Sequence, residues 1–165
     1  MGLFRDLSQL PKTAKGGVLV IGNFDGVHKG HQAVLSRALD KAQKIEGETA
    51  TEVTVLVFDP HPRQYFAPHA PSLRLTRLET RARLLEQYGA TNTVALTFDK
   101  NMAEMSAEDF IQKIIIESFD ARAICIGHDF HFGKNRAGTP DMLKTAGEKN
   151  GFDVLFIAAV SPDNA

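Results

Sequence analysis

Two histidines, His28 and His31, stand in a glycine-containing stretch that runs from Gly22 to His31. The stretch follows an apolar run at 17–21 and precedes a helical pattern that is expected to start at His31. A strand that ends in glycine and turns at once into a helix presents backbone N–H groups and a positive helix end at one place, which favours a phosphate. Two imidazoles beside that place could hold a polyphosphate and stabilise charge while a phosphoryl or nucleotidyl bond breaks.

Other chemistry for this stretch is less well supported by the residues. The glutamate of an H-E-x-x-H zinc site is missing and no third ligand is evident nearby, so no metal site is predicted. Helix capping by the histidines is the structural alternative. The stretch contains neither G-x-G-x-x-G nor a terminal G-K-[ST], which argues against a hydride-transferring dinucleotide site and against a P-loop ATPase.

Two further segments concentrate histidine, aspartate, arginine and glycine. One is Asp59-Pro60-His61-Pro62-Arg63, and the other runs from Gly127 to Arg136. Both follow apolar runs that are expected to be strands. In an open parallel sheet, ligands bind beyond the carboxyl ends of the strands, near the point where the strand order reverses. We therefore expect the three segments to lie on one rim of a sheet.

The elements that must position these segments alternate between strand and helix. Strands are expected at 17–21, 53–58, 93–98, 123–126 and 154–160, and a long polar connection at 63–75. Helices are expected from His31 to Gly47, from a capping box at 76–79 to Gly89, from Ser106, and from Thr139-Pro140 to about Asn150. This order predicts an α/β fold with a doubly wound, Rossmann-like parallel sheet of about five strands and flanking helices.

The composition is that of an ordinary globular protein. The 165 residues are 43% hydrophobic and 24% charged, and we expect a single domain over 1–165. A formal net charge of −1 argues against a nucleic-acid partner. No apolar run approaches the length of a membrane span and no secretory signal is evident, so a cytoplasmic protein without a membrane partner is expected. The one cysteine, Cys125, lies in an apolar run and is predicted to be a buried core residue.

The sequence His28-Lys29-Gly30-His31 matches the H-x-G-H signature and resembles the nucleotidyltransferase superfamily. Together, the three ordered segments closely resemble the FMN adenylyltransferase (FAD synthetase) module of bacterial bifunctional riboflavin kinase/FAD synthetases, over about Pro11 to Val160. The resemblance implies transfer of AMP from ATP to FMN, with Mg²⁺, to give FAD and pyrophosphate. The FMN phosphate would attack the α-phosphorus in line, without a covalent intermediate.

The resemblance also implies roles for individual residues. His28 and His31 would contact the ATP phosphates, and the ATP site would include Gly22, Asn23, Phe24, Asp25, Gly26 and Gly30. The flavin would be framed by Pro60, His61, Pro62, Asp129, Phe130 and Phe132. Arg63 and Arg136 are candidate phosphate partners because a guanidinium binds phosphate with two parallel hydrogen bonds.

Several of these residues have structural alternatives. Phe24 could be a core aromatic residue, and Asp25 could only hold its loop through a side-chain hydrogen bond to the backbone. Phe130 and Phe132 alternate as residues at a strand edge would, and could simply close the end of the sheet. Arg63 could be an ordinary solvated arginine.

The chain departs from the family pattern after its last strand. A Ser/Thr-rich segment that helps to close over ATP, and the riboflavin kinase domain that normally follows, are not found in 1–165. We therefore expect this chain to bind flavin or adenine nucleotide but to adenylylate poorly. A catalytically incomplete flavin- or nucleotide-binding module is one alternative. Another is an adenylyl- or cytidylyltransferase for a different phosphorylated substrate, against which the segments at 59–63 and 129–133 argue.

Overall fold

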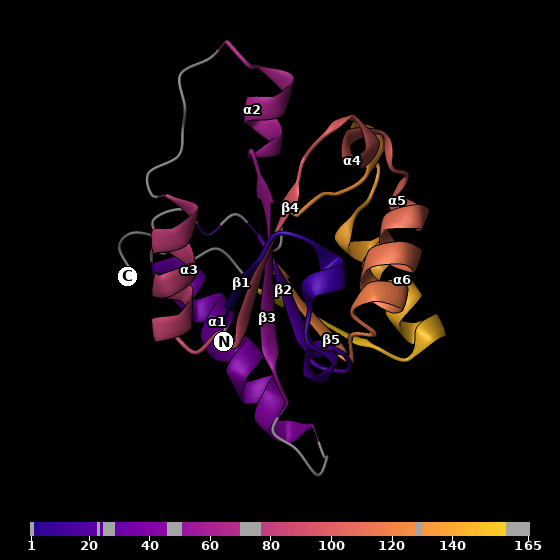
Figure 1. Ribbon diagram of the computed structural model, residues 1–165. Coiled ribbons are helices and arrows are strands. Elements are labelled where there is room, and N and C mark those ends of the chain that lie inside the picture. Colours follow the sequence, from indigo (N-terminus) through magenta and orange to yellow (C-terminus); the bar gives the residue numbers. More distant parts are fainter. Residues whose placement is uncertain are drawn as a thin grey trace.

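A six-stranded sheet forms the centre of the protein (Figure 1). The computed structural model describes residues 2–22, 24, 29–45, 51–69, 77–127 and 130–157. The strand order is β1-β4-β3-β2-β5-β6, and all five pairings are parallel. The strands are β1 (Gly2–Phe4), β2 (Val18–Ile21), β3 (Val53–Asp59), β4 (Asn92–Thr97), β5 (Ala123–Gly127) and β6 (Asp153–Ile157).

The order of the strands gives a doubly wound sheet. From β2 the chain proceeds through β3 to β4 on one side, and then crosses back to β5 and β6 on the other side of β2. The strand order therefore reverses between β2 and β5, where ligands of such sheets bind. The predicted fold class is confirmed.

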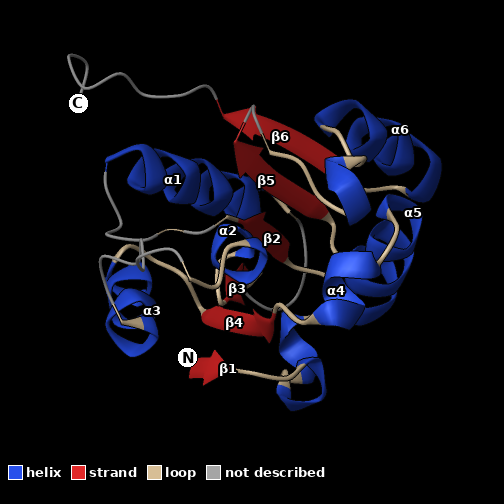
Figure 2. Ribbon diagram, turned by 90° about the horizontal axis from the view of Figure 1, so that it is seen from above, coloured by secondary structure: helices blue, strands red, loops and turns tan. Residues whose placement is uncertain are grey.

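Helices cover both faces of the sheet (Figure 2). On one face lie α1 (Lys29–Lys44) and α3 (Leu78–Gln87). On the other lie α4 (Lys100–Glu104), α5 (Ala107–Asp109), the π-helix η3 (Phe110–Ser118) and α6 (Pro140–Asn150). The remaining helical segments are η1 (Leu7–Gln9), η2 (Lys12–Ala14), α2 (Pro62–Phe66) and η4 (Lys134–Arg136).

The alternation of side chains along β2 explains why two layers of helices are needed. Val18 and Val20 pack into the core under α1 and α3, while Leu19 and Ile21 pack into the core under η3 and α6. Successive residues of a strand point to opposite faces, so a strand that is apolar throughout must be covered on both sides. The four residues of β2 are all buried, which makes β2 the rigid support for the segment that follows it.

Most predicted elements are confirmed within one or two residues, and the helix signals at Ser106 and Thr139 are confirmed as N-caps. The Ser106 hydroxyl accepts a hydrogen bond from the N–H of Asp109, and the Thr139 hydroxyl accepts one from Met142. Gly151 ends α6 at φ 84°, a left-handed conformation that glycine adopts without strain.

Several details of the prediction are wrong, among them the helix α4 at 100–104, which was not predicted. The sheet has a sixth strand, β1, which is too short to show a period in the sequence. The connection predicted at 63–75 begins inside a helix, α2, because Pro62 supplies the φ angle of a first helical turn. Finally, the N-cap of α3 is Arg77 and makes no side-chain cap hydrogen bond, whereas the predicted capping box required Thr76, which lies outside the described residues.

Candidate active site

The three segments singled out in the sequence follow three adjacent strands. Gly22 follows β2, Asp59 ends β3 and Gly127 ends β5, and these strands are neighbours in the order β3-β2-β5. Because the strands are parallel, their carboxyl ends lie on one rim of the sheet. The fold therefore brings the segments together at the point where the strand order reverses.

In the first segment, the start of helix α1 is two residues earlier than predicted. The helix begins at Lys29, so Gly30 and His31 lie in its first turn. The N–H groups of a first turn have no partner within the helix, and the helix dipole makes this end positive. The predicted ATP-site residues Gly30 and His31 therefore stand where a phosphate group is favoured.

Phe24 contacts the first turn of α1. Its ring is 2% exposed, belongs to the core under α1, and lies 4.9 Å from the ring of His31 between centroids, at an interplanar angle of 58°. A side chain added at Gly22 would place its Cβ 2.8 Å from the Phe24 ring, so the ring would have to shift to admit it. The core role weighed for Phe24 is therefore confirmed, while its part in ATP binding stays a prediction.

The second segment leaves the sheet at the end of β3. Asp59 is joined to Pro60 by a cis peptide bond, and α2 begins two residues later at Pro62. The carbonyl of His61 accepts hydrogen bonds from the N–H groups of Gln64 and Tyr65, at 2.8 and 3.1 Å. Pro60 is exposed, while His61 and Pro62 are half-buried. Arg63 belongs to α2, and its side chain lies outside what the structure describes.

A group of aromatic rings that the sequence analysis did not single out stands beside this segment. Tyr65 lies 5.1 Å from Phe66 and 5.3 Å from Phe98 between ring centroids, and Phe98 lies 5.7 Å from Phe58. Phe66 is 69% exposed. The four residues come from α2 and from the carboxyl ends of β3 and β4, so only the folded sheet brings them together. We call Phe58, Tyr65, Phe66 and Phe98 the aromatic cluster.

In the third segment, a tight loop is anchored by an aromatic ring. Phe132 is 6% exposed and contacts Phe110, and Phe130 stacks on it at 5.7 Å and 16°. Phe132 and Gly138 form a two-residue antiparallel bridge with hydrogen bonds of 3.2 and 2.7 Å. Phe132 thus belongs to the core under η3 and α6, which agrees with its structural alternative, and Phe130, which stacks on it, is half-buried.

The charged candidate of this loop, Arg136, is exposed. It stands in the single turn η4, where Asn135 and Arg136 both have positive φ angles of 58° and 56°. Gly133 starts the turn at φ 76°, and the N–H of Lys134 donates to the carbonyl of Met105 at 2.8 Å. The loop is therefore held against the start of α5 with its basic side chains exposed.

Five predicted site residues, Asn23, Asp25, Gly26, His28 and Asp129, lie outside the described residues. Among the described residues, no group of three His, Cys, Asp or Glu side chains is placed to hold a metal ion.

Cys125 is fully buried, and burial raises the pKa of its thiol to about 12. The cysteine therefore stays protonated at neutral pH and is a core residue, as predicted.

Comparison with known proteins assigns the family. The family model described as FAD synthetase matches residues 10–165. The chain belongs to the FAD synthetase family. The match includes all three segments of the carboxyl rim.

Two proteins that are similar to this chain are longer than it is. The bifunctional riboflavin kinase/FMN adenylyltransferase of Pseudomonas fluorescens is 36% identical over 163 residues, which is 99% of this chain and 51% of that protein. The protein of the same name from Escherichia coli (strain K12) is 36% identical over 149 residues, 90% of this chain and 46% of that protein. The chain spans about half the length of the curated relatives it matches.

A solved structure shows the same fold. The macrolide-efflux protein from Streptococcus pneumoniae superposes with a TM-score of 0.82 at 25% identity, over 99% of this chain and 51% of that one.

None of the helices in the described part of this chain is both long and apolar enough to cross a membrane.

Proposed function

We propose that this chain is an FMN adenylyltransferase, which transfers AMP from ATP to FMN to give FAD and pyrophosphate. The observation that carries the proposal is the convergence of three family-typical segments on the carboxyl rim, at the reversal of strand order. Membership of the FAD synthetase family supports the same conclusion.

On the ATP side, the first turn of α1 supplies the electrostatics. The N–H groups of this turn and the imidazoles of His31 and His28 would face the phosphates, and Phe24 keeps the His31 ring in place. As the FMN phosphate attacks the α-phosphorus in line, negative charge accumulates on the departing pyrophosphate. Donors that are already oriented stabilise this charge without having to reorganise.

On the flavin side, the segment after β3 supplies flat apolar surface. The exposed ring of Phe66 and the neighbouring rings of Tyr65 and Phe98 offer the kind of surface on which an isoalloxazine stacks. Pro60, His61 and Pro62 adjoin these rings, and Phe130 and Asp129 would approach from the segment after β5. Arg136 and Arg63 would contact phosphate.

Magnesium enters this proposal as part of the substrate MgATP. Mg²⁺ is usually held by phosphate oxygens and waters with one or two carboxylates, rather than by a cage of protein ligands. The proposal includes a cytoplasmic location, no nucleic-acid partner, and fusion to a riboflavin kinase domain such as the relatives' names indicate.

The test is an assay of FAD and pyrophosphate formation from FMN and MgATP. It compares the 165-residue chain with a chain extended beyond Ala165 by the Ser/Thr-rich segment of the family. We expect FAD from the extended chain and much slower formation from the shorter one. Full turnover by the shorter chain would contradict the expected impairment. FMN binding without FAD formation by either chain would favour the incomplete binding module.

A further inference from the structure

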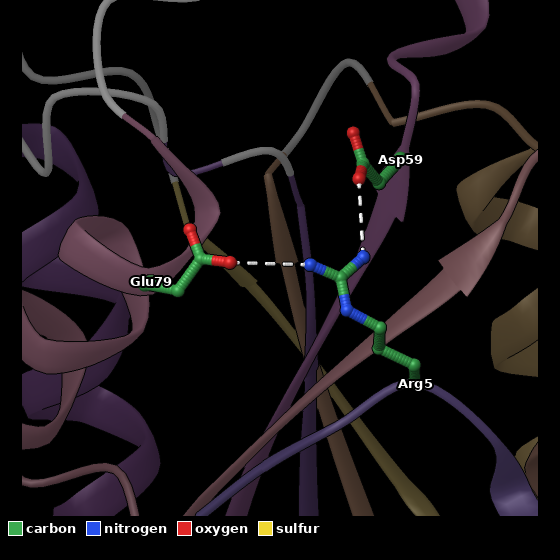
Figure 3. Close-up of polar contacts among 3 residues, drawn as sticks. All are labelled: Arg5, Asp59 and Glu79. Atoms are coloured by element: carbon green, nitrogen blue, oxygen red, sulfur yellow. Dashed lines mark hydrogen bonds and ion pairs between the residues drawn. The ribbon is translucent and has the colours of Figure 1, made fainter.

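Arg5 joins three separate parts of the chain at the rim of the sheet (Figure 3). Its Nη1 lies 3.5 Å from Oδ2 of Asp59, and its Nη2 lies 3.3 Å from Oε1 of Glu79. Arg5 directly follows the edge strand β1, Asp59 ends β3 and Glu79 lies in the first turn of α3. The guanidinium therefore stands between two carboxylates, and each is contacted by a different nitrogen.

Asp59 is the residue through which this link reaches the candidate site. It is the last residue of β3, and its carbonyl accepts a hydrogen bond of 3.2 Å from the N–H of Phe98. The chain from Asp59 leads at once into Pro60, His61 and α2. Asp59 therefore fixes the direction in which the segment that leads to α2 leaves the sheet. Because Asp59 is hydrogen-bonded to Phe98, its position also sets where the rings of α2 meet the ring of Phe98.

The carboxylate of Asp59 is more deeply buried than the carboxylate of Glu79. The side chain of Asp59 is 27% exposed, whereas those of Arg5 and Glu79 are 56% and 63% exposed. A half-buried carboxylate has lost part of its hydration and gains more from a nearby cation than an exposed one does. The contact with Asp59 therefore holds the segment, while Glu79 mainly holds the guanidinium.

Glu79 stays ionised in this role. Its own backbone N–H, together with the charge of Arg5, holds the pKa of the Glu79 carboxyl below its usual value. A planar guanidinium presents its donors in a rigid fork and can face two carboxylates at once, which the single ammonium of lysine does less well. Arginine at position 5 thus fits the geometry better than another cation.

We propose that Arg5 is a positioning residue: by its ion pair with Asp59 it fixes the segment Asp59–Phe66, and through that segment the flavin side of the site. The effect on flavin rests on the proposed function, and the fixing of the segment does not. Arg5 and β1 lie before residue 10, where the match to the family model begins. Of the three residues of the link, Arg5 alone therefore lies outside that match, whereas Asp59 and Glu79 lie within it.

The experiment measures amide hydrogen exchange and steady-state kinetics of Arg5→Gln, Arg5→Lys and Glu79→Gln. Exchange is followed at Gln64, Tyr65 and Phe98, whose N–H groups donate within or onto the segment. We expect Arg5→Gln to speed this exchange about fivefold and to raise KM for FMN by a similar factor, with KM for ATP unchanged. Arg5→Lys should recover part of both effects, and Glu79→Gln should show a smaller loss.

Arg37→Ala is the matched control, because Arg37 is an exposed arginine on α1. Kinetics are measured on the extended chain, and exchange on the 165-residue chain. Unchanged exchange at the three amides in Arg5→Gln would overturn the inference, whatever the chain catalyses. Equal rises of both KM values, or the same changes in Arg37→Ala, would also overturn it. Faster exchange in Arg5→Gln with no FAD formed by the unaltered chain would support the fixing of the segment and refute only the proposed function.

Discussion

The segments after β2 and β5 differ from the segment after β3 in how they are anchored. Phe24 and Phe132 are buried at 2% and 6% exposure and attach the segments after β2 and β5 to opposite cores of the sheet. The segment after β3 forms α2, which projects beyond the carboxyl end of the strand (Figure 1) and carries Phe66 at 69% exposure.

Under the proposed function, the same rim would perform two tasks, and this difference would separate them. A group that stabilises developing charge must be oriented in advance, since a small displacement weakens its contacts with the transition state. A planar apolar substrate instead needs exposed rings on which to stack, and these must remain uncovered until it arrives. Under the proposed function, buried aromatic residues would serve the first task and exposed ones the second.

The largest expected effect comes from the histidines of the anchored segment. Replacing both, as His28→Ala/His31→Ala, should lower kcat for FAD formation about a thousandfold or more, because the donors to the phosphates are lost. Far-UV circular dichroism should be unchanged. His69→Ala is the control, since His69 is an exposed histidine outside the three segments. Full activity of the double variant would refute the phosphate role.

A smaller but still large effect, on stability, is expected from the buried ring of Phe132 in the segment after β5. Phe132→Ala should lower the free energy of unfolding by about 3 kcal/mol, because it leaves a cavity against Phe110 and Phe130. Urea denaturation gives this value. A loss below about 1 kcal/mol would mean that the ring is not the anchor described here.

The smallest effect on stability is expected at the exposed ring. Phe66→Ala should change the free energy of unfolding by less than about 0.5 kcal/mol, yet raise KM for FMN about tenfold through lost stacking. Tyr88→Ala is the matched control, because Tyr88 is an exposed aromatic residue next to α3. If Phe66→Ala lowered stability as much as Phe132→Ala, the contrast between the two regions would be wrong.

Much of the fold could be predicted because the signals are local. The apolar runs of β2 to β6 and the N-caps Ser106 and Thr139 depend on residues close in sequence. β1 was missed because three half-buried residues carry no readable period, and its pairing with β4 joins residues about ninety positions apart. The helix α2 was missed because a single turn after Pro62 has too few residues for a helical pattern.

The sequence by itself determined which types of residue stand at the rim. The H-x-G-H stretch and the two later segments specify their side chains and follow apolar strands, so their place at strand ends follows from backbone hydrogen bonding alone. Only the tertiary structure decided which rings support and which are exposed, because burial depends on the elements that pack over a residue. It also decided that Arg5 faces Asp59 and Glu79. Such a contact between distant positions has no periodic or local signature in the chain.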